Sequence, residues 1–95
     1  MHIISKNPII EFSDRHPESK NSLDNWYRIM RRTNFETFVS LRLTFPSADI
    51  VGNLTIFNIG GNKVRLIAAI HYNRCKVYIR NILTHVEYDK YKWRI

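Results

Sequence analysis

Several features that are common in small proteins are scarce in this chain of 95 residues. It has one cysteine, Cys75, so neither an internal disulfide framework nor a zinc site built from cysteines alone can form. A reducing compartment is the simplest interpretation. No run approaches the roughly 18 apolar residues of a membrane-spanning helix. The first residues, MHIISKNPIIEF, lack the uninterrupted apolar stretch of a signal peptide. These absences favour the cytoplasm.

Familiar catalytic and metal-binding patterns are also missing. The four histidines, His2, His16, His71 and His85, show no ligand spacing such as HxxxH. The sequence contains no Ser-His-Asp arrangement, no phosphate-binding GxxxxGK and no dinucleotide-binding GxGxxG. We therefore expect no metal ion and no cofactor.

Acidic residues are few, at 8 Asp and Glu against 15 Lys and Arg, which gives a formal net charge of +7. The imbalance is concentrated in the last third of the chain. Residues 1–62 carry seven basic and six acidic side chains, whereas residues 63–95 carry eight basic and two acidic ones. So basic a segment indicates a polyanion or an acidic protein as partner. A basic, solvated surface without a partner has the same composition.

Length and hydrophobic content predict a single domain over residues 1–95, because a chain of this size buries about 65% of its unfolded surface. The first half has a helical pattern. Apolar residues at helical spacing predict helices over 8–16 and 18–32, and a less regular one over 35–43. A short strand over 1–5 precedes them, and residues 45–52 are predicted to form a loop.

The second half changes to a strand pattern. Strands are predicted over 54–59, 63–72 and 75–83, joined by turns at 60–62 and 73–74. A last helical turn or two is predicted from Thr84 or His85 to about residue 93. The chain is therefore expected to adopt an α+β fold, with helices packed on one face of an antiparallel meander and a short C-terminal helix.

A two-residue loop at 73–74 pairs Tyr72 with Cys75 and sets the register of the whole hairpin. The side facing the helices is then almost wholly apolar, with Val64, Leu66, Ala68, Ile70, Tyr72, Cys75, Val77, Ile79, Asn81 and Leu83. The opposite side carries Lys63, Arg65, Ile67, Ala69, His71, Lys76, Tyr78, Arg80, Ile82 and Thr84. Arg65 and Arg80 become diagonal neighbours within about 8 Å at Cβ. Asn58, on the preceding strand, has the parity to share their side.

The charged side is typical of a surface that binds a nucleic-acid backbone. Arginine binds phosphate oxygens bidentately and keeps its charge. Lys63 and Lys76 lie beside the two arginines, and Tyr78 offers a ring on which a base can stack. The competing interpretation is a merely solvated sheet face. Two interpretations of His85 also stay open, a proton-transfer group near neutral pH or a neighbour of a helix cap.

Residues 57–93 resemble the HigB family of toxins from bacterial toxin–antitoxin systems, a branch of the RelE-like fold. The resemblance is carried by six short motifs in this order: Phe57-Asn58, Gly60-Gly61-Asn62, Arg65-Leu66, Tyr78-Ile79-Arg80, Thr84-His85 and Glu87-Tyr88-Asp89. The composite is specific, and it covers about 40% of the chain. The family layout implies a compact α+β domain with a curved antiparallel sheet.

The resemblance also implies a function. It indicates an endoribonuclease that cleaves messenger RNA, often on the ribosome, by attack of the RNA 2′-hydroxyl on the adjacent phosphate. The implied partner is a cognate antitoxin, a helix-turn-helix protein of the HigA type, through which the pair represses its own operon. A non-catalytic RNA- or ribosome-binding module and an inactive, antitoxin-binding relative are the competing hypotheses.

Site residues follow from the same resemblance. Arg65 and Arg80 are expected to hold the phosphate and its developing charge, and His85 and Tyr88 are the candidates for proton transfer. The residues expected to bind or orient the RNA backbone are Asn58, Asn62, Lys63, Lys76, Tyr78, Lys90 and Lys92, with Arg94 beside them.

Overall fold

The computed structural model describes residues 1–61 and 63–90. Three helices and a short strand come first: β1 (His2–Ile3), α1 (Asn7–Arg15), α2 (Lys20–Arg32) and α3 (Phe38–Thr44). The sheet and a last helix follow: β2 (Asp49–Val51), β3 (Leu54–Ile59), β4 (Val64–His71), β5 (Lys76–Thr84) and α4 (His85–Asp89). The strands form one sheet in the order β1-β5-β4-β3-β2. The predicted α+β fold is confirmed.

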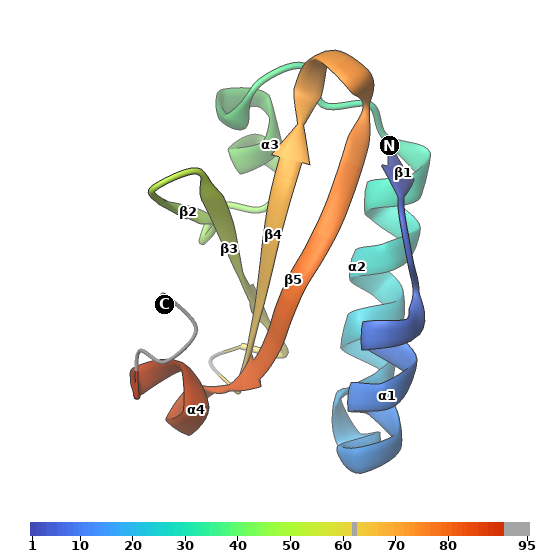
Figure 1. Ribbon diagram of the computed structural model, residues 1–95, viewed down its shortest axis with the longest axis vertical. Helices are drawn as coiled ribbons and strands as arrows, with labels where there is room; N and C mark the ends of the chain where they lie inside the picture. The colour runs from blue at the N-terminus through green and yellow to red at the C-terminus, as the bar shows by residue number, and fades with distance from the viewer. Residues whose placement is uncertain (62, 91–95) are drawn as a thin grey trace.

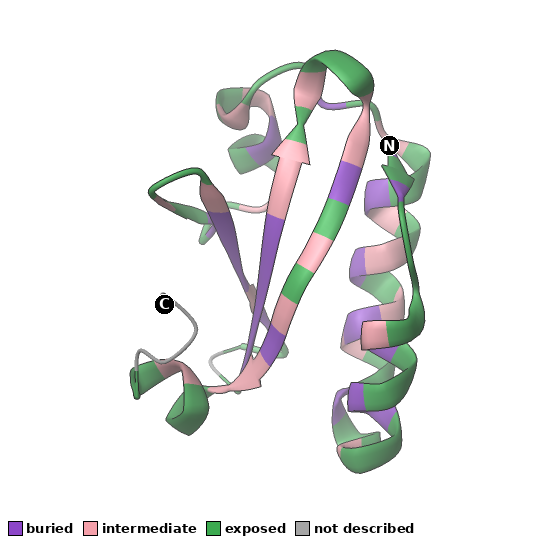
Figure 2. Cartoon of the chain, in the orientation of Figure 1, coloured by how far each residue is buried: buried purple, intermediate pink, exposed green. Residues whose placement is uncertain are grey.

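The core lies between α1, α2 and one face of the sheet, which we call the inner face (Figure 1). Leu23, Trp26 and Met30 repeat at helical spacing along α2, and each is at most 1% exposed. Trp26 packs edge-on against Phe57 of β3, with ring centroids 5.4 Å apart. The buried positions on α2 in Figure 2 accordingly face the strands. Among the described residues no helix is long and apolar enough to span a membrane.

Two strands lie outside the predicted meander. β1 pairs with β5 in parallel, so the sheet is mostly but not wholly antiparallel. The prediction of a loop over 45–52 is wrong at its end, because Asp49–Val51 form β2 and pair with the start of β3. A strand of three residues is too short to show an alternating pattern in the sequence.

The connection between β4 and β5 is longer than the predicted two-residue loop. His71 and Lys76 form the last pair, so Tyr72–Cys75 make the turn. Cys75 has a left-handed backbone with φ of 54°, which closes the turn, and it is not part of the strand. The predicted pairing of Tyr72 with Cys75 also places His71 opposite Lys76. The register near the turn was therefore predicted correctly, although the turn is two residues longer.

The predicted register is right for one half of the hairpin and wrong for the other. Near the turn Ala68 pairs with Ile79, as predicted. Beyond it the register shifts by one, so that Leu66 pairs with Ile82, and Arg80 has no partner on β4. Arg80 is thus the extra residue of a β-bulge.

The bulge changes which residues face the core. Ile82 joins the inner face and is 8% exposed, whereas the prediction placed it on the other side. Asn81 and Leu83, predicted to be inner, pair with Ile67 and Arg65 on the opposite side. We call that side the outer face.

Candidate functional site

Asn58, Arg65 and Ile67 lie on the outer face at the end of the sheet nearest α4. Asn58 pairs directly with Arg65 across β3 and β4, as the sequence predicted. Leu83 flanks Arg65 on the other strand. The outer face is not open here, because Arg65 is 9% exposed and Ile67 is fully buried. A solvated sheet face is therefore the wrong description of this end.

Arg65 is a buried cation held by α4. Its Nη2 donates to Nδ1 of His85 at 3.4 Å, and its guanidinium carbon lies 5.6 Å from the centre of the Tyr88 ring. Its Nη1 donates to the Val64 carbonyl oxygen at 3.4 Å. Among the described residues no carboxylate forms an ion pair with Arg65. A desolvated guanidinium without an anion is costly unless an anion arrives to bind it.

α4 begins where it does because of a capping box. The backbone N–H of Glu87 donates to the Thr84 hydroxyl at 3.2 Å, and the Thr84 N–H donates to the Glu87 carboxylate at 2.9 Å. The second bond lowers the pKa of Glu87 below its ordinary 4.5. The backbone N–H of His85 also donates to the Lys63 carbonyl at 3.0 Å. These bonds fix the first turn of α4 over Arg65.

His85 is held at both ring nitrogens. Because arginine only donates, Nδ1 accepts from Arg65 and carries no proton. Nε2 lies 3.3 Å from a carboxylate oxygen of Asp89, one helical turn later, which is ion-pair distance for a protonated ring. The contact with Arg65 favours the tautomer whose Nδ1 lone pair is directed at the guanidinium. Arg65, His85, Tyr88 and Asp89 are called the Arg65 cluster below.

Asp89 received no role from the sequence, although it belongs to the quoted Glu87-Tyr88-Asp89 motif. The signal that could have found it is the i, i+4 spacing from His85 within a helix. The sequence predicted a helix here and did not use that spacing. The structure brings together three of the four predicted catalytic residues, Arg65, His85 and Tyr88, and adds Asp89.

Comparison with known proteins gives the chain a family. Residues 19–91 match the model of the HigB toxin family, described as the RelE-like toxic component of a toxin–antitoxin system. The chain belongs to this family of HigB toxins. The match covers α2, α3, α4 and the whole sheet except β1.

Individual relatives agree with the family match. The toxin is 34% identical over 93 residues to the mRNA interferase HigB of Escherichia coli O6:H1. This alignment covers 95% of this chain and 90% of the relative. It is 33% identical over 92 residues to the mRNA interferase toxin HigB of Escherichia coli K12 and to the mRNA interferase HigB of Shigella flexneri. Each of these two alignments covers 94% of this chain and 88% of the relative.

Arg80, the remaining predicted catalytic residue of the toxin, lies at the bulge on the outer face. It is exposed, and no hydrogen bond or ion pair joins it to another residue in the part of the chain that the structure describes. The predicted diagonal pairing with Arg65 is not formed as such, because the register has shifted between them. Arg80 instead flanks Ile67, closer to the middle of the sheet.

Other predicted RNA-binding residues of the toxin are spread more widely. Tyr78 and Lys76 lie toward the far hairpin, where the Tyr78 ring meets the His71 ring edge-on at 5.3 Å. Lys90 is exposed at the end of α4. Asn62, Lys92 and Arg94 lie outside the described residues.

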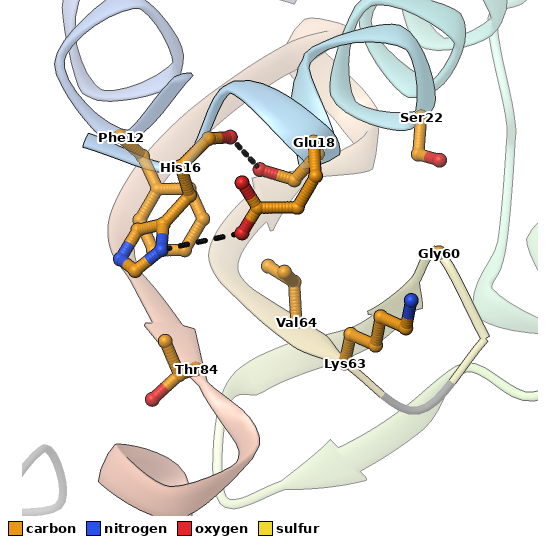
Figure 3. A pocket seen from close by; sticks show the side chains of 9 residues that line it. Phe12, His16, Glu18, Ser22, Gly60, Lys63, Val64 and Thr84 are labelled. Atoms are coloured by element: carbon orange, nitrogen blue, oxygen red, sulfur yellow. Dashed lines mark hydrogen bonds and ion pairs between the residues drawn. The ribbon is translucent and has the colours of Figure 1, made fainter. Parts of the chain in front are cut away.

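Lys63 sits at a second feature, a cavity of about 290 Å³ on the helix side of the sheet end. Figure 3 shows its walls, where His16 and Glu18 face Lys63 and Thr84. The His16 Nδ1 lies 3.5 Å from a Glu18 carboxylate oxygen. Lys63 is two residues from Arg65 in the sequence, but it lines the opposite side of the sheet end.

Proposed function

We propose that this toxin is an mRNA interferase, an endoribonuclease that cleaves messenger RNA on the ribosome and so inhibits translation. The observation that carries the proposal is the Arg65 cluster, in which a buried guanidinium without a carboxylate partner among the described residues contacts an imidazole. The names of the relatives, mRNA interferase HigB, support the same activity.

The reaction proposed is attack of a 2′-hydroxyl on the adjacent phosphorus. The new bond joins the 2′-oxygen to phosphorus, and the bond to the 5′-oxygen of the next nucleotide breaks. One fragment ends in a 2′,3′-cyclic phosphate and the other begins with a 5′-hydroxyl. A base must take the 2′-proton, an acid must give one to the 5′-oxygen, and cations must stabilise the charge at phosphorus.

Arg65 supplies the cation nearest to the proton-transfer groups. When its guanidinium turns to the phosphate oxygens, His85 loses its donor at Nδ1, and that nitrogen becomes free to accept the 2′-proton. Asp89 stabilises the imidazolium that results. Tyr88 keeps Arg65 in place through its ring and is the second proton-transfer candidate. Arg80 approaches the phosphate from the bulge.

The RNA backbone is proposed to follow the outer face. Arg65 and Arg80 mark its path between α4 and the hairpin, with Tyr78 as a stacking platform toward the hairpin. Contacts from Asn58, Asn62, Lys63, Lys76, Lys90 and Lys92 complete the proposed binding set.

The wider setting is proposed from the family. We infer a cytoplasmic toxin in which residues 1–95 act as a single domain, bound by a helix-turn-helix antitoxin of the HigA type. Contact with operator DNA is made only through the antitoxin. A non-catalytic RNA- or ribosome-binding module is the second candidate function, and the basic outer face alone supports it equally well.

Mapping of RNA ends by primer extension in a cell-free translation reaction tests the proposal. The wild-type chain is compared with the double variant Arg65→Ala/Arg80→Ala, with and without ribosomes. New ends with the wild type alone are expected. Because Arg65 is buried, circular dichroism must show that the variant is folded, and the exposed Arg80→Ala single variant serves as a second control. Inhibited translation without new ends identifies a binding module.

A further inference from the structure

One half of β3 has an open edge. β2 pairs only with Leu54, Thr55 and Ile56. The chain before β2 turns away, and its turn is closed by a bond from the Ala48 N–H to the Phe45 carbonyl at 3.0 Å. Residues 57–59 therefore pair with β4 on one side and have no strand on the other within residues 1–61 and 63–90.

The ladder indicates which backbone groups face this open edge. Val51 and Leu54 close a two-residue turn, so their N–H and C=O groups point at each other. In an antiparallel ladder the backbone N–H and C=O groups of every second residue point to the same neighbouring strand. Ile56 and Asn58 therefore direct these groups toward the β2 side, as Leu54 does. Asn58 lies beyond the end of β2. Its N–H and C=O are thus available to an added strand.

A groove of about 290 Å³ lies along this edge. Its walls come from α2, the end of α3 and β3, and they include Trp26, Ile29, Phe45, Asn58 and Ile59. Asn58 and Ile59 point to opposite faces of the sheet, yet both line the groove. The groove therefore opens at the edge of the strand and not on one face.

The described residues that line the groove are all uncharged, although the chain carries a net charge of +7. Its remaining walls are Ser22, Asn25, Thr44 and Gly60. A phosphate backbone finds no cation among its described walls, whereas the mixed polar and apolar walls, with Ile29 and Phe45 among them, suit the side chain of a polypeptide. The volume lies at the lower limit of small-molecule pockets, which fits one large side chain better than a whole ligand.

An exposed apolar strip continues the groove along α3. Val39 and Leu43 are one helical turn apart and are 73% and 82% exposed. Leu43 directly precedes the two groove residues of this helix end, Thr44 and Phe45. Exposed apolar residues that adjoin an open edge mark a protein interface.

We propose that this edge and groove bind a short extended segment of the cognate antitoxin. The segment adds as a strand beside Asn58, places one apolar side chain in the groove and packs against Val39 and Leu43. The inference rests on the assignment of the chain as the toxin of a toxin–antitoxin pair. Because Asn58 pairs with Arg65, the added strand lies two strand spacings, about 10 Å, from the strand that carries Arg65. A partner bound here restricts access to the outer face.

The test uses the full-length cognate antitoxin. Leu43→Glu and Ile29→Glu each place a charge in the proposed interface, and Ile10→Glu, at a 49% exposed apolar position on α1, is the matched control. We expect the two interface variants to weaken antitoxin binding about tenfold or more, since a desolvated, unpaired charge is costly at an interface. We expect the control to bind like the wild type. Cleavage of RNA without antitoxin should be unchanged in Leu43→Glu.

Hydrogen exchange gives a second readout on the wild-type chain. The Asn58 amide should exchange measurably more slowly in the complex, because the added strand accepts its bond. Equal antitoxin affinity in all variants, or unchanged exchange at Asn58, overturns the proposal. Two other results would also overturn the proposal. One is self-association of the wild type that Leu43→Glu abolishes, and the other is a loss of RNA binding in Leu43→Glu. Antitoxin binding through the groove by a toxin that cuts no RNA would contradict the proposed function alone.

Discussion

Arg65 differs from the other basic residues of the outer face in being buried, with an imidazole and an aromatic ring as its neighbours. The guanidinium is planar, and its fixed fork can hold two phosphate oxygens. These properties make its shape as important as its charge. A lysine in its place would keep the charge and lose the fork and the stacking.

Arg65→Lys is therefore expected to separate binding from chemistry. The cleavage rate should fall about 100-fold or more, the cost of removing one preorganised donor, while RNA affinity falls less than about tenfold. Single-turnover cleavage and a binding titration on the same RNA measure the two effects. Arg74→Lys, an exposed arginine in the far turn, is the matched control. Equal losses in rate and affinity would make Arg65 a binding residue only.

Asp89 is predicted to position His85. Asp89→Asn removes the carboxylate 3.3 Å from Nε2, which we propose favours the tautomer with its proton on that nitrogen. We expect the imidazole ¹⁵N shifts of His85 to change and the cleavage rate to fall about tenfold or more. Asp14→Asn, at an exposed position of α1, controls for the lost charge. Unaltered ¹⁵N shifts would show that Asp89 does not set the tautomer.

Among the helices and strands, β5 determines how the site is built. Its bulge at Arg80 lets the strand present Arg80 and Asn81 outside and return Ile82 to the core. Without the extra residue, Ile82 would face outward. The bulge thus allows Ile82 to be buried in the core while Arg80 stays on the outer face.

Paired alanine substitutions test this register. Ile82→Ala should lower the free energy of unfolding by about 2–5 kcal/mol, as for other buried large-to-small changes, and Leu83→Ala by less than about 1.5 kcal/mol. Chemical denaturation monitored by circular dichroism measures both. The opposite ranking would restore the unbulged register, in which Leu83 faces the core.

The cap of α4 should depend on pH. The pKa of Glu87 is lowered in the folded chain, so its carboxylate stabilises the fold fully above its ordinary 4.5 and loses that effect as the pH falls through the lower folded value. Thermal unfolding of wild type and Glu87→Gln should differ at pH 7, with the wild type more stable, and the difference should shrink as the pH falls through the folded pKa of Glu87. A difference that is constant over this range would contradict the capping role.

The sequence predicted these elements unevenly, for physical reasons. The α2 stripe shows long, regular periodicity, and the strand over 54–59 is an apolar run that ends at a glycine-rich turn; both are confirmed. The bulge was missed because the register was extrapolated from the turn, although Val77, Ile79 and Ile82 break strict alternation. The burial of Arg65 could not be read from the strand pattern, because it comes from α4 folding over the sheet. The RNA-binding roles of Asn62 and Lys92 stay predictions.

The domain has two chemically distinct surfaces near the same strand. The outer face carries Arg65, Arg80 and Lys76, which suit a phosphate backbone. The open edge of β3 is lined by uncharged residues, which suit a polypeptide. Asn58 belongs to both, since its side chain shares the outer face with Arg65 and its backbone faces the edge. RNA and antitoxin are therefore expected to bind different surfaces that meet at this residue.

The chemistry of the new RNA ends tests the central claim, that the Arg65 cluster cleaves RNA with the RNA's own 2′-hydroxyl. The fragments made by the wild type should end in a 2′,3′-cyclic phosphate and begin with a 5′-hydroxyl. An RNA with a single 2′-deoxynucleotide at the cut position should bind and stay intact. Fragments with a 5′-phosphate, or cleavage of the deoxy-substituted RNA, would contradict the account.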